Sequence, residues 1–173
     1  SHRVTVGDQW RRTEGGLPDM HRLTYMPMRT GRDRSGPHLN VPSPPFNYRE
    51  LAQRLAQGED WHFAARLLRE LVRRSRRIAD VDAVDDLHAE PGSTGMRGWD
   101  AIIGGVAHMT GRDRVSDPSV LDWCFDPERY CAGGELFDPF HSPAKYFWID
   151  YLRTPVELQT RNVVFPIGNL EGV

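Results

Sequence analysis

The chain has 173 residues, of which 39% are hydrophobic and 27% are charged, and its formal net charge is −2. This length allows one domain with a tail or two very small domains. A net charge so close to zero gives no overall bias toward nucleic acid or a membrane surface, no run approaches the roughly 18–20 apolar residues of a membrane span, and the first residues lack the pattern of a signal peptide. Two cysteines, Cys124 and Cys131, are too few for a disulfide framework, so we expect reduced thiols in a cytoplasmic protein.

The first 45 residues form a separate compositional segment. Residues 1–45 are rich in glycine, proline, arginine and histidine, and the prolines from position 37 onward exclude a helix there. Short strands could form at Val4–Val6 and Leu23–Met28. We expect an extended or flexible arm, which either folds when it binds a partner or is a loosely held terminus.

Residues 46–173 have the pattern of a mainly α fold: a compact helical domain of five to six helices with a short C-terminal strand. Asn47 is a good N-cap, with Glu50 three residues later as its capping-box partner, and Gly58 predicts the end of this first helix. A second helix is expected over residues 59–77, because apolar residues recur there with the helical period.

This second helix carries arginines beside its apolar face. They include Arg66, Arg69 and Arg73. Two helices joined by a short glycine turn can form a helix-turn-helix, so residues 47–77 could bind DNA through these arginines. The simpler interpretation is a helical hairpin with a solvated basic face, since arginines near a helix C-terminus also suit the helix dipole.

A proline-glycine turn separates the next two helices. A short acidic helix is expected near residues 81–87, and a Pro-Gly pair then breaks the chain. Ser93 or Thr94 can hydrogen-bond the exposed amides of the helix that follows. Trp99 opens that helix, whose apolar residues recur at helical spacing and therefore belong to the core.

The C-terminal part predicts several shorter elements. Asp117 caps a short helix whose first residue is proline. The helix over residues 143–152 is apolar on more than one face, which indicates burial or a side that meets a partner. Thr154-Pro155-Val156-Glu157 matches a capping box that starts a short helix, with Asn162 as a left-handed stop. Val163–Phe165 is expected to be the C-terminal strand.

A few polar residues could carry chemistry. Zinc could be bound by a set drawn from Cys124, Cys131, His141, His108 and His88, although the spacing of the two cysteines is not the tight one of structural zinc sites. Cys124 with His141 and Asp138 could form a thiol nucleophile, a base and an orienting carboxylate. Because Cys124 lies between Trp123 and Phe125, a place in the core is the simpler interpretation.

Several short stretches also carry a family resemblance. The turn from Glu90 to Gly95 precedes Trp99-Asp100-Ala101, and the pattern returns in His141-Ser142-Pro143, Thr154–Leu158 and Asn169–Val173. With these motifs, residues 46–173 resemble a group of uncharacterised actinobacterial antitoxin-like proteins, some of which are found beside or fused to helix-turn-helix regulators. Members often carry Asp-Pro before the tryptophan helix, where this chain has Met96-Arg97.

The resemblance implies a non-enzymatic protein in an actinobacterium or its phage that binds another protein, a toxin or a regulator, or that self-associates. No catalytic residue, metal or cofactor carries over from it. We expect the binding residues in the turn and in the late apolar helix: Glu90, Ser93, Thr94, Tyr146, Phe147 and Tyr151. The alternatives are a DNA-binding regulator that uses residues 47–77 and a small metal- or thiol-dependent hydrolase.

Overall fold

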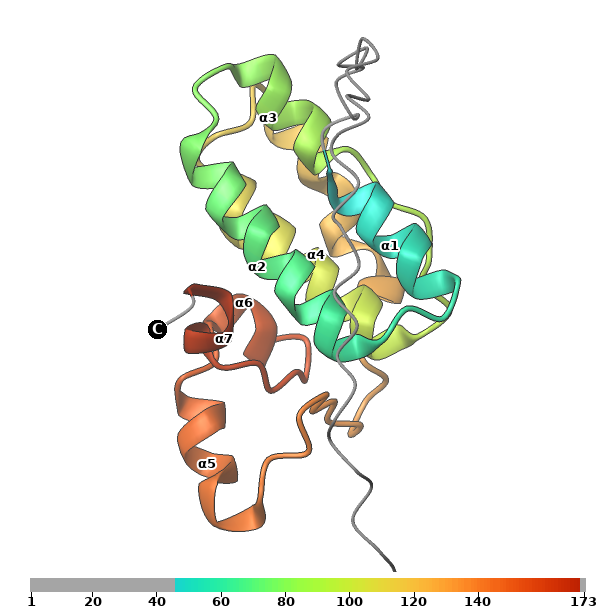
Figure 1. Cartoon of the computed structure of the whole chain (residues 1–173), viewed down its shortest axis with the longest axis vertical. Coiled ribbons are helices and arrows are strands. Elements are labelled where there is room, and N and C mark those ends of the chain that lie inside the picture. The colour runs from blue at the N-terminus through green and yellow to red at the C-terminus, as the bar shows by residue number, and fades with distance from the viewer. Residues whose placement is uncertain (1–45, 172–173) are drawn as a thin grey trace, which may run out of the picture. The chain divides into compact units, whose positions relative to one another are not determined.

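The computed structural model describes residues 46–171. The predicted arm with its two candidate strands lies outside the described residues, as do residues 172–173. Within residues 46–171 the chain is mainly helical, as predicted, with seven α-helices and two 3-10 helices (Figure 1). Their bounds are α1 (Tyr48–Ala56), α2 (Trp61–Arg77), α3 (Val81–His88), α4 (Arg97–Gly111), η1 (Pro118–Phe125), η2 (Pro127–Arg129), α5 (Ala144–Leu152), α6 (Val156–Gln159) and α7 (Ile167–Glu171).

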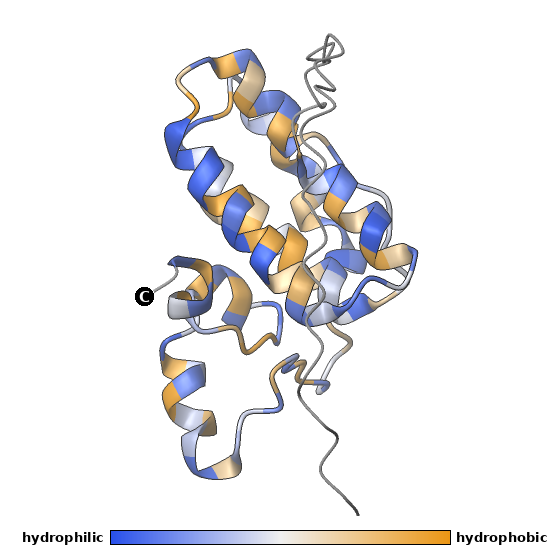
Figure 2. Ribbon diagram, viewed as in Figure 1, coloured by the Kyte–Doolittle hydropathy of each residue, from blue (hydrophilic) through white to orange (hydrophobic). Residues whose placement is uncertain are grey.

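Helix α4 is the element around which the others pack. It contacts α1, α2, α3, α6, η1 and η2, and every residue from Gly98 to Ala107 is buried. The predicted core residues of this helix, Trp99, Ile102, Ile103 and Val106, all lie inside. By contrast, α2 has one apolar face only, and its ribbon alternates between hydrophobic and hydrophilic residues (Figure 2). No helix in the described part of the chain is both long and apolar enough to cross a membrane.

Glycine lets α6 approach α4 closely. A Cβ atom placed on Gly105 would lie 2.5 Å from Cδ2 of Leu158 and 3.1 Å from the carbonyl oxygen of Glu157. Leu158 is fully buried, so its side chain has little room to move away. Glycine in a helix interior costs about 1 kcal/mol relative to alanine, and the close contact with α6 offsets that cost here.

The predicted start of the first helix is confirmed, but only half of its capping box forms. Oδ1 of Asn47 accepts a hydrogen bond from the Glu50 amide at 2.9 Å. The Glu50 carboxylate does not return to Asn47 and pairs instead with Arg54 at 2.7 Å, one turn further on. Gly58 follows with a φ of +88°, a left-handed conformation that suits glycine at the end of a helix. Asp60 then caps α2 by accepting hydrogen bonds from the amides of His62 and Phe63.

The predicted capping box at Thr154 is wrong. No side chain caps α6. The Thr154 hydroxyl donates to the Asp150 carbonyl at 2.8 Å and accepts from the Phe165 amide at 2.9 Å. This residue therefore joins the last turn of α5 to the buried segment that follows α6. The predicted left-handed stop at Asn162 is confirmed by its φ of 57°.

The predicted C-terminal strand Val163–Phe165 does not form. Among the described residues, this segment makes a single parallel bridge between Val163 and Phe137, with the Phe137 and Val164 amides each donating a hydrogen bond of 2.9 Å. The pairing cannot extend into a strand, because Pro139 and Pro166 soon follow on the two segments and proline has no amide proton to donate to a ladder. The three residues are fully buried all the same.

A chain of hydrogen bonds runs through the core between α1, α3 and α4. Thr110 lies 2.9 Å from the Tyr48 hydroxyl and 3.0 Å from Nε2 of His88. Nδ1 of His88 lies 2.7 Å from the Val84 carbonyl, so Nδ1 carries the proton and Nε2 accepts. Burial lowers the pKa of His88 and raises that of Tyr48, which keeps both side chains neutral.

We predict that Gly105→Ala lowers the free energy of unfolding by about 1–3 kcal/mol, because the added methyl group would overlap Leu158 and press on the Glu157 carbonyl. Urea unfolding measures the change. Gly133→Ala is the control, since a Cβ atom added at Gly133 would have nothing within 4 Å. An unchanged or raised stability for Gly105→Ala would contradict the close approach of α6.

We predict that the lowered pKa of His88 makes the free energy of unfolding decrease in acid. Because its pKa in the folded state lies below the ordinary value of 6.5, the unfolded chain binds the proton more readily, and stability falls as the pH drops below about 6.5. The limiting slope for one group is about 1.4 kcal/mol per pH unit. Urea unfolding from pH 7.5 to 5 should show this decline.

The matched variant is His88→Asn, whose amide can still donate to Val84. It should flatten the decline, although desolvation also lowers the pKa of His108, so part of the slope should remain. His62→Asn, at an exposed position, should leave the slope unchanged. An equal slope in the wild-type and His88→Asn proteins would refute the assignment.

Candidate functional site

Helix α5 exposes a large apolar surface. None of its nine residues is buried. Trp148 is 68% exposed and Leu152 77% exposed, and these two lie four residues apart on one side of the helix. Tyr146 and Ile149 are also exposed, and Val156 at the start of α6 extends the apolar area. Large apolar side chains gathered in this way are typical of an interaction surface.

Hydrogen bonds at both ends hold α5 in place. Before the helix, the Asp138 carboxylate accepts from the Ser142 amide at 2.7 Å. At its end, the Thr154 hydroxyl donates to the Asp150 carbonyl, and the Gln159 side-chain amide donates to the Tyr151 carbonyl at 2.8 Å. The backbone of α5 is thus bonded to its flanking segments, while Tyr146, Trp148, Ile149 and Leu152 stay exposed.

The predicted binding residues of this helix differ in exposure. Tyr146 is exposed, whereas Phe147 and Tyr151 are half-buried and stack on each other with ring centroids 6.4 Å apart. Trp148 and Leu152 are the most exposed large hydrophobic residues of the helix, and neither is one of the predicted binding residues. Their i, i+4 spacing was visible in the sequence, but the pattern alone did not show which side of the helix lacks a neighbour.

The predicted turn residues serve mainly to hold α4. Glu90 and Ser93 are exposed, but Thr94 is buried. The Asp100 carboxylate accepts from the Ser93 hydroxyl and from the Thr94 amide, both at 2.8 Å. Neither Ser93 nor Thr94 caps α4, which has no side-chain cap, so that prediction is wrong. Asp100 of the helix bonds the turn, and the Thr94 hydroxyl bonds the Met96 backbone just before the helix.

Arg129 completes a buried ion pair beneath this turn. Nη1 of Arg129 lies 3.5 Å from Oδ1 of Asp100, and both side chains are at most 7% exposed. The guanidinium also donates to the Pro91 carbonyl at 2.6 Å and lies over the Trp123 ring, 5.0 Å from its centroid. These contacts join the turn, α4, η1 and η2, so the turn is a rigid part of the fold and only its outer residues are available to a partner.

A second buried arginine ties α6 to η1. Arg161 donates to the carbonyls of Glu157 and Cys124 at 2.5 Å and 2.9 Å and lies over the Tyr130 ring. Desolvation lowers the pKa of its guanidinium. The Glu157 carboxylate meanwhile pairs with Arg112 at 2.6 Å. The Arg161–Cys124 bond and the Arg112–Glu157 pair are not predicted, because each joins parts of the chain that are well separated in sequence.

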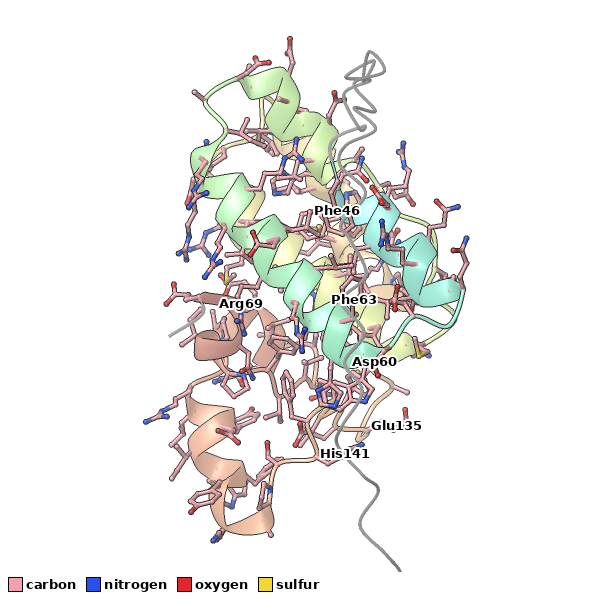
Figure 3. All side chains as sticks on the ribbon, viewed as in Figure 1. Phe46, Asp60, Phe63, Arg69, Glu135 and His141 are labelled. Atoms are coloured by element: carbon pink, nitrogen blue, oxygen red, sulfur yellow. The ribbon has the colours of Figure 1, made fainter. Side chains whose placement is uncertain are left out.

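The arginines of the DNA-binding alternative differ in their surroundings. Arg66 is exposed. Arg69 donates to the Asn169 carbonyl at 3.0 Å, at the place where α2 passes α7 (Figure 3), and Arg73 pairs with Glu70 at 3.0 Å. Two of the three guanidiniums therefore make bonds within the domain, and one of these bonds holds α7.

The cysteines do not meet His141 in a reactive arrangement. Burial raises the pKa of the Cys124 thiol to about 12 and also raises that of Cys131, so neither forms a thiolate readily at neutral pH. His141 is exposed and lines a pocket at the start of α2 that includes neither cysteine. Within residues 46–171, no group of three or more His, Cys, Asp or Glu side chains could hold a metal ion.

Comparison of the chain with protein-family models, with curated proteins and with solved structures gave no significant match. The antitoxin-like context therefore stays a prediction. The candidate site rests on geometry: an uncovered apolar helix, a rigid turn and a pocket beside the start of α2.

We predict that Asp100→Ala lowers the free energy of unfolding by about 3–5 kcal/mol, because it leaves the Arg129 guanidinium buried without a carboxylate. Denaturant unfolding measures the loss. Glu70→Ala, which removes one partner of the exposed pair with Arg73, should cost less than about 1 kcal/mol. Similar costs for the two variants would show that the buried pair does not organise the turn.

Proposed function

We propose that this protein binds another protein by placing α5 in an apolar groove of its partner. The observation that carries the proposal is the exposure of Trp148 and Leu152 on a helix that has no buried residue. Recognition of a helix in a groove uses apolar anchors at i, i+3 and i+4, and tryptophan is among the residues that most often dominate binding energy. The tethered ends of α5 support the same function, because a preformed helix loses little conformational entropy on binding.

The charges of α5 favour a protein over a lipid surface. Helices that lie on membranes are usually rich in lysine and arginine on their polar face. In and just after α5, the two cations Lys145 and Arg153 exceed the one carboxylate, Asp150, by a single charge, so this element has little net attraction for anionic lipid. A groove with apolar walls and few charges on its rim fits it better.

The size of α5 favours an unlike protein over a second copy of the chain. A helix of nine residues is only about 13 Å long. Two such helices that cross each other touch over part of that length, whereas a stable interface buries about 800 Å² on each partner. A groove that encloses α5 on several sides can also cover Val156 beside it.

The resemblance to antitoxin-like proteins supplies a context for this proposal. The partner would be a toxin or a regulator, bound without chemistry on the part of this chain. A cytoplasmic location is part of the same proposal and is supported by two cysteines that form no disulfide. DNA binding through residues 47–77 has less support, because Arg69 and Arg73 already make bonds within the domain.

We predict that a photo-crosslinking amino acid, p-benzoylphenylalanine, placed at Leu152 of the full chain in its source cells will capture one protein other than this chain. Trp148→Ala in the same chain should lower the yield at least about tenfold, since it removes the largest anchor. Because Trp148 is exposed, this variant should keep its melting temperature. Gel mobility and mass spectrometry of the crosslinked band give both the yield and the partner.

The matched control places the crosslinker at Phe125, another exposed apolar residue, on η1. It should not capture the same protein. Equal capture from Phe125, or a yield unaffected by Trp148→Ala, would refute α5 as the binding element. A crosslink to a second copy of the chain would instead establish self-association and overturn the choice of an unlike partner.

A further inference from the structure

A second candidate site, which is concave, lies where α2 begins. It is a pocket of about 300 Å³, at the lower end of the range for ligand sites. Three aromatic side chains line it, Trp61, Trp99 and Phe137. Three acidic residues line it as well: Glu59, Asp60 and Asp138. Figure 3 labels Asp60 at the start of α2 and His141, a further lining residue, in the loop that leads to α5.

The aromatic residues of the pocket are held by packing. Trp99 is only 2% exposed, and its ring meets that of Phe137 edge to face, with centroids 6.5 Å apart. Trp61 meets Phe140 in the same way at 5.4 Å. The pocket is therefore shaped before any ligand enters, which lowers the cost of binding.

The carboxylates of the pocket lack cationic partners in the described part of the chain. None of Glu59, Asp60 and Asp138 forms an ion pair with a residue of the 46–171 segment. Backbone amides orient them: Asp60 accepts from His62 and Phe63, and Asp138 accepts from Phe140 and Ser142. Each carboxylate oxygen has two acceptor sites, so these carboxylates can still accept from a ligand.

The sign of the electrostatic potential in the pocket depends on the helix N-terminus, which is positive, and on the acidic lining residues, which are negative. The N-terminus of α2 contributes the equivalent of about half a positive charge, which by itself would attract an anion. Three acidic residues around one small pocket outweigh it, although Asp60 bonds that terminus itself. Aromatic rings also attract cations at their faces, and Trp61 and Phe137 are only half-buried, although His62 stacks on one face of Trp61 with ring centroids 3.3 Å apart. Both kinds of lining residue therefore favour a positively charged ligand.

We propose that this pocket binds the guanidinium group of an arginine side chain presented by another polypeptide. A guanidinium is planar and stacks on aromatic rings, and it offers five N–H donors to surrounding carboxylates. A quaternary ammonium would use the rings but donate no hydrogen bond to the carboxylates. A lysine ammonium is more strongly hydrated and does not stack. The pocket is lined by no residue of α5, so it can be tested separately.

The test is a titration of the full chain with N-acetyl-L-arginine N-methylamide, followed by the indole N–H signals in ¹H–¹⁵N spectra. We expect saturable shifts for Trp61 and Trp99, with a dissociation constant on the order of 1 mM. Trp123, whose indole donates to the His88 carbonyl in the core, and Trp148 on α5 should not shift. The lysine analogue and tetramethylammonium chloride, used at the same concentrations, should bind more weakly.

Charge-removing variants locate the site. Asp60→Asn keeps a capping side chain but removes the charge, and we expect it to weaken binding of the arginine analogue about fivefold. The separate variant Glu59→Gln should weaken binding to a similar extent. Asp117→Asn is the matched control, because Asp117 is also an N-cap, with its carboxylate on the Ser119 amide, and lines no part of the pocket. The proposal would be overturned if Asp117→Asn weakened binding as much as Asp60→Asn does. It would also be overturned if tetramethylammonium bound more tightly than the arginine analogue, or if the Trp61 and Trp99 signals did not shift.

Discussion

The burial of α4 is the constraint on which the rest of the structure depends. Six other elements reach this helix, which is possible only because small residues occupy the places where they come closest. Gly105 admits α6, and a Cβ on Gly98 would lie 2.2 Å from the Phe137 ring. Gly104 and Gly105, in the middle of α4, weaken the helix taken alone, so α4 depends on its neighbours for stability as much as they depend on it.

Burying α4 also brings polar groups inside, and each of them must find a partner there. Asp100 meets Arg129, and Thr110 meets both Tyr48 and His88. Such bonds contribute little net energy when formed, but breaking one exposes the full cost of a buried unpaired group. They therefore contribute less to stability than to specificity, because another arrangement of the helices would leave these polar groups unpaired.

Local features of the sequence predicted most of the fold. The cap at Asn47, the stop at Gly58 and the helical period after Trp99 each depend on a few neighbouring residues, and all three are confirmed. What failed depends on distant partners. Thr154 matches a capping box, yet its hydroxyl bonds Phe165, and the expected strand at Val163 found only Phe137 to pair with. The pocket beside α2 draws its residues from three separate stretches, so no local pattern could reveal it.

The uncovered apolar side chains of α5 also bear on how long the free protein survives. A partner that covers Trp148 and Leu152 binds the folded chain and not the unfolded one, and it therefore stabilises the fold by mass action. Without it, the same side chains are open to self-association and to the cellular systems that clear proteins with exposed apolar surface. On this view the amount of the chain in a cell tracks the amount of its partner, so α5 sets lifetime as well as affinity.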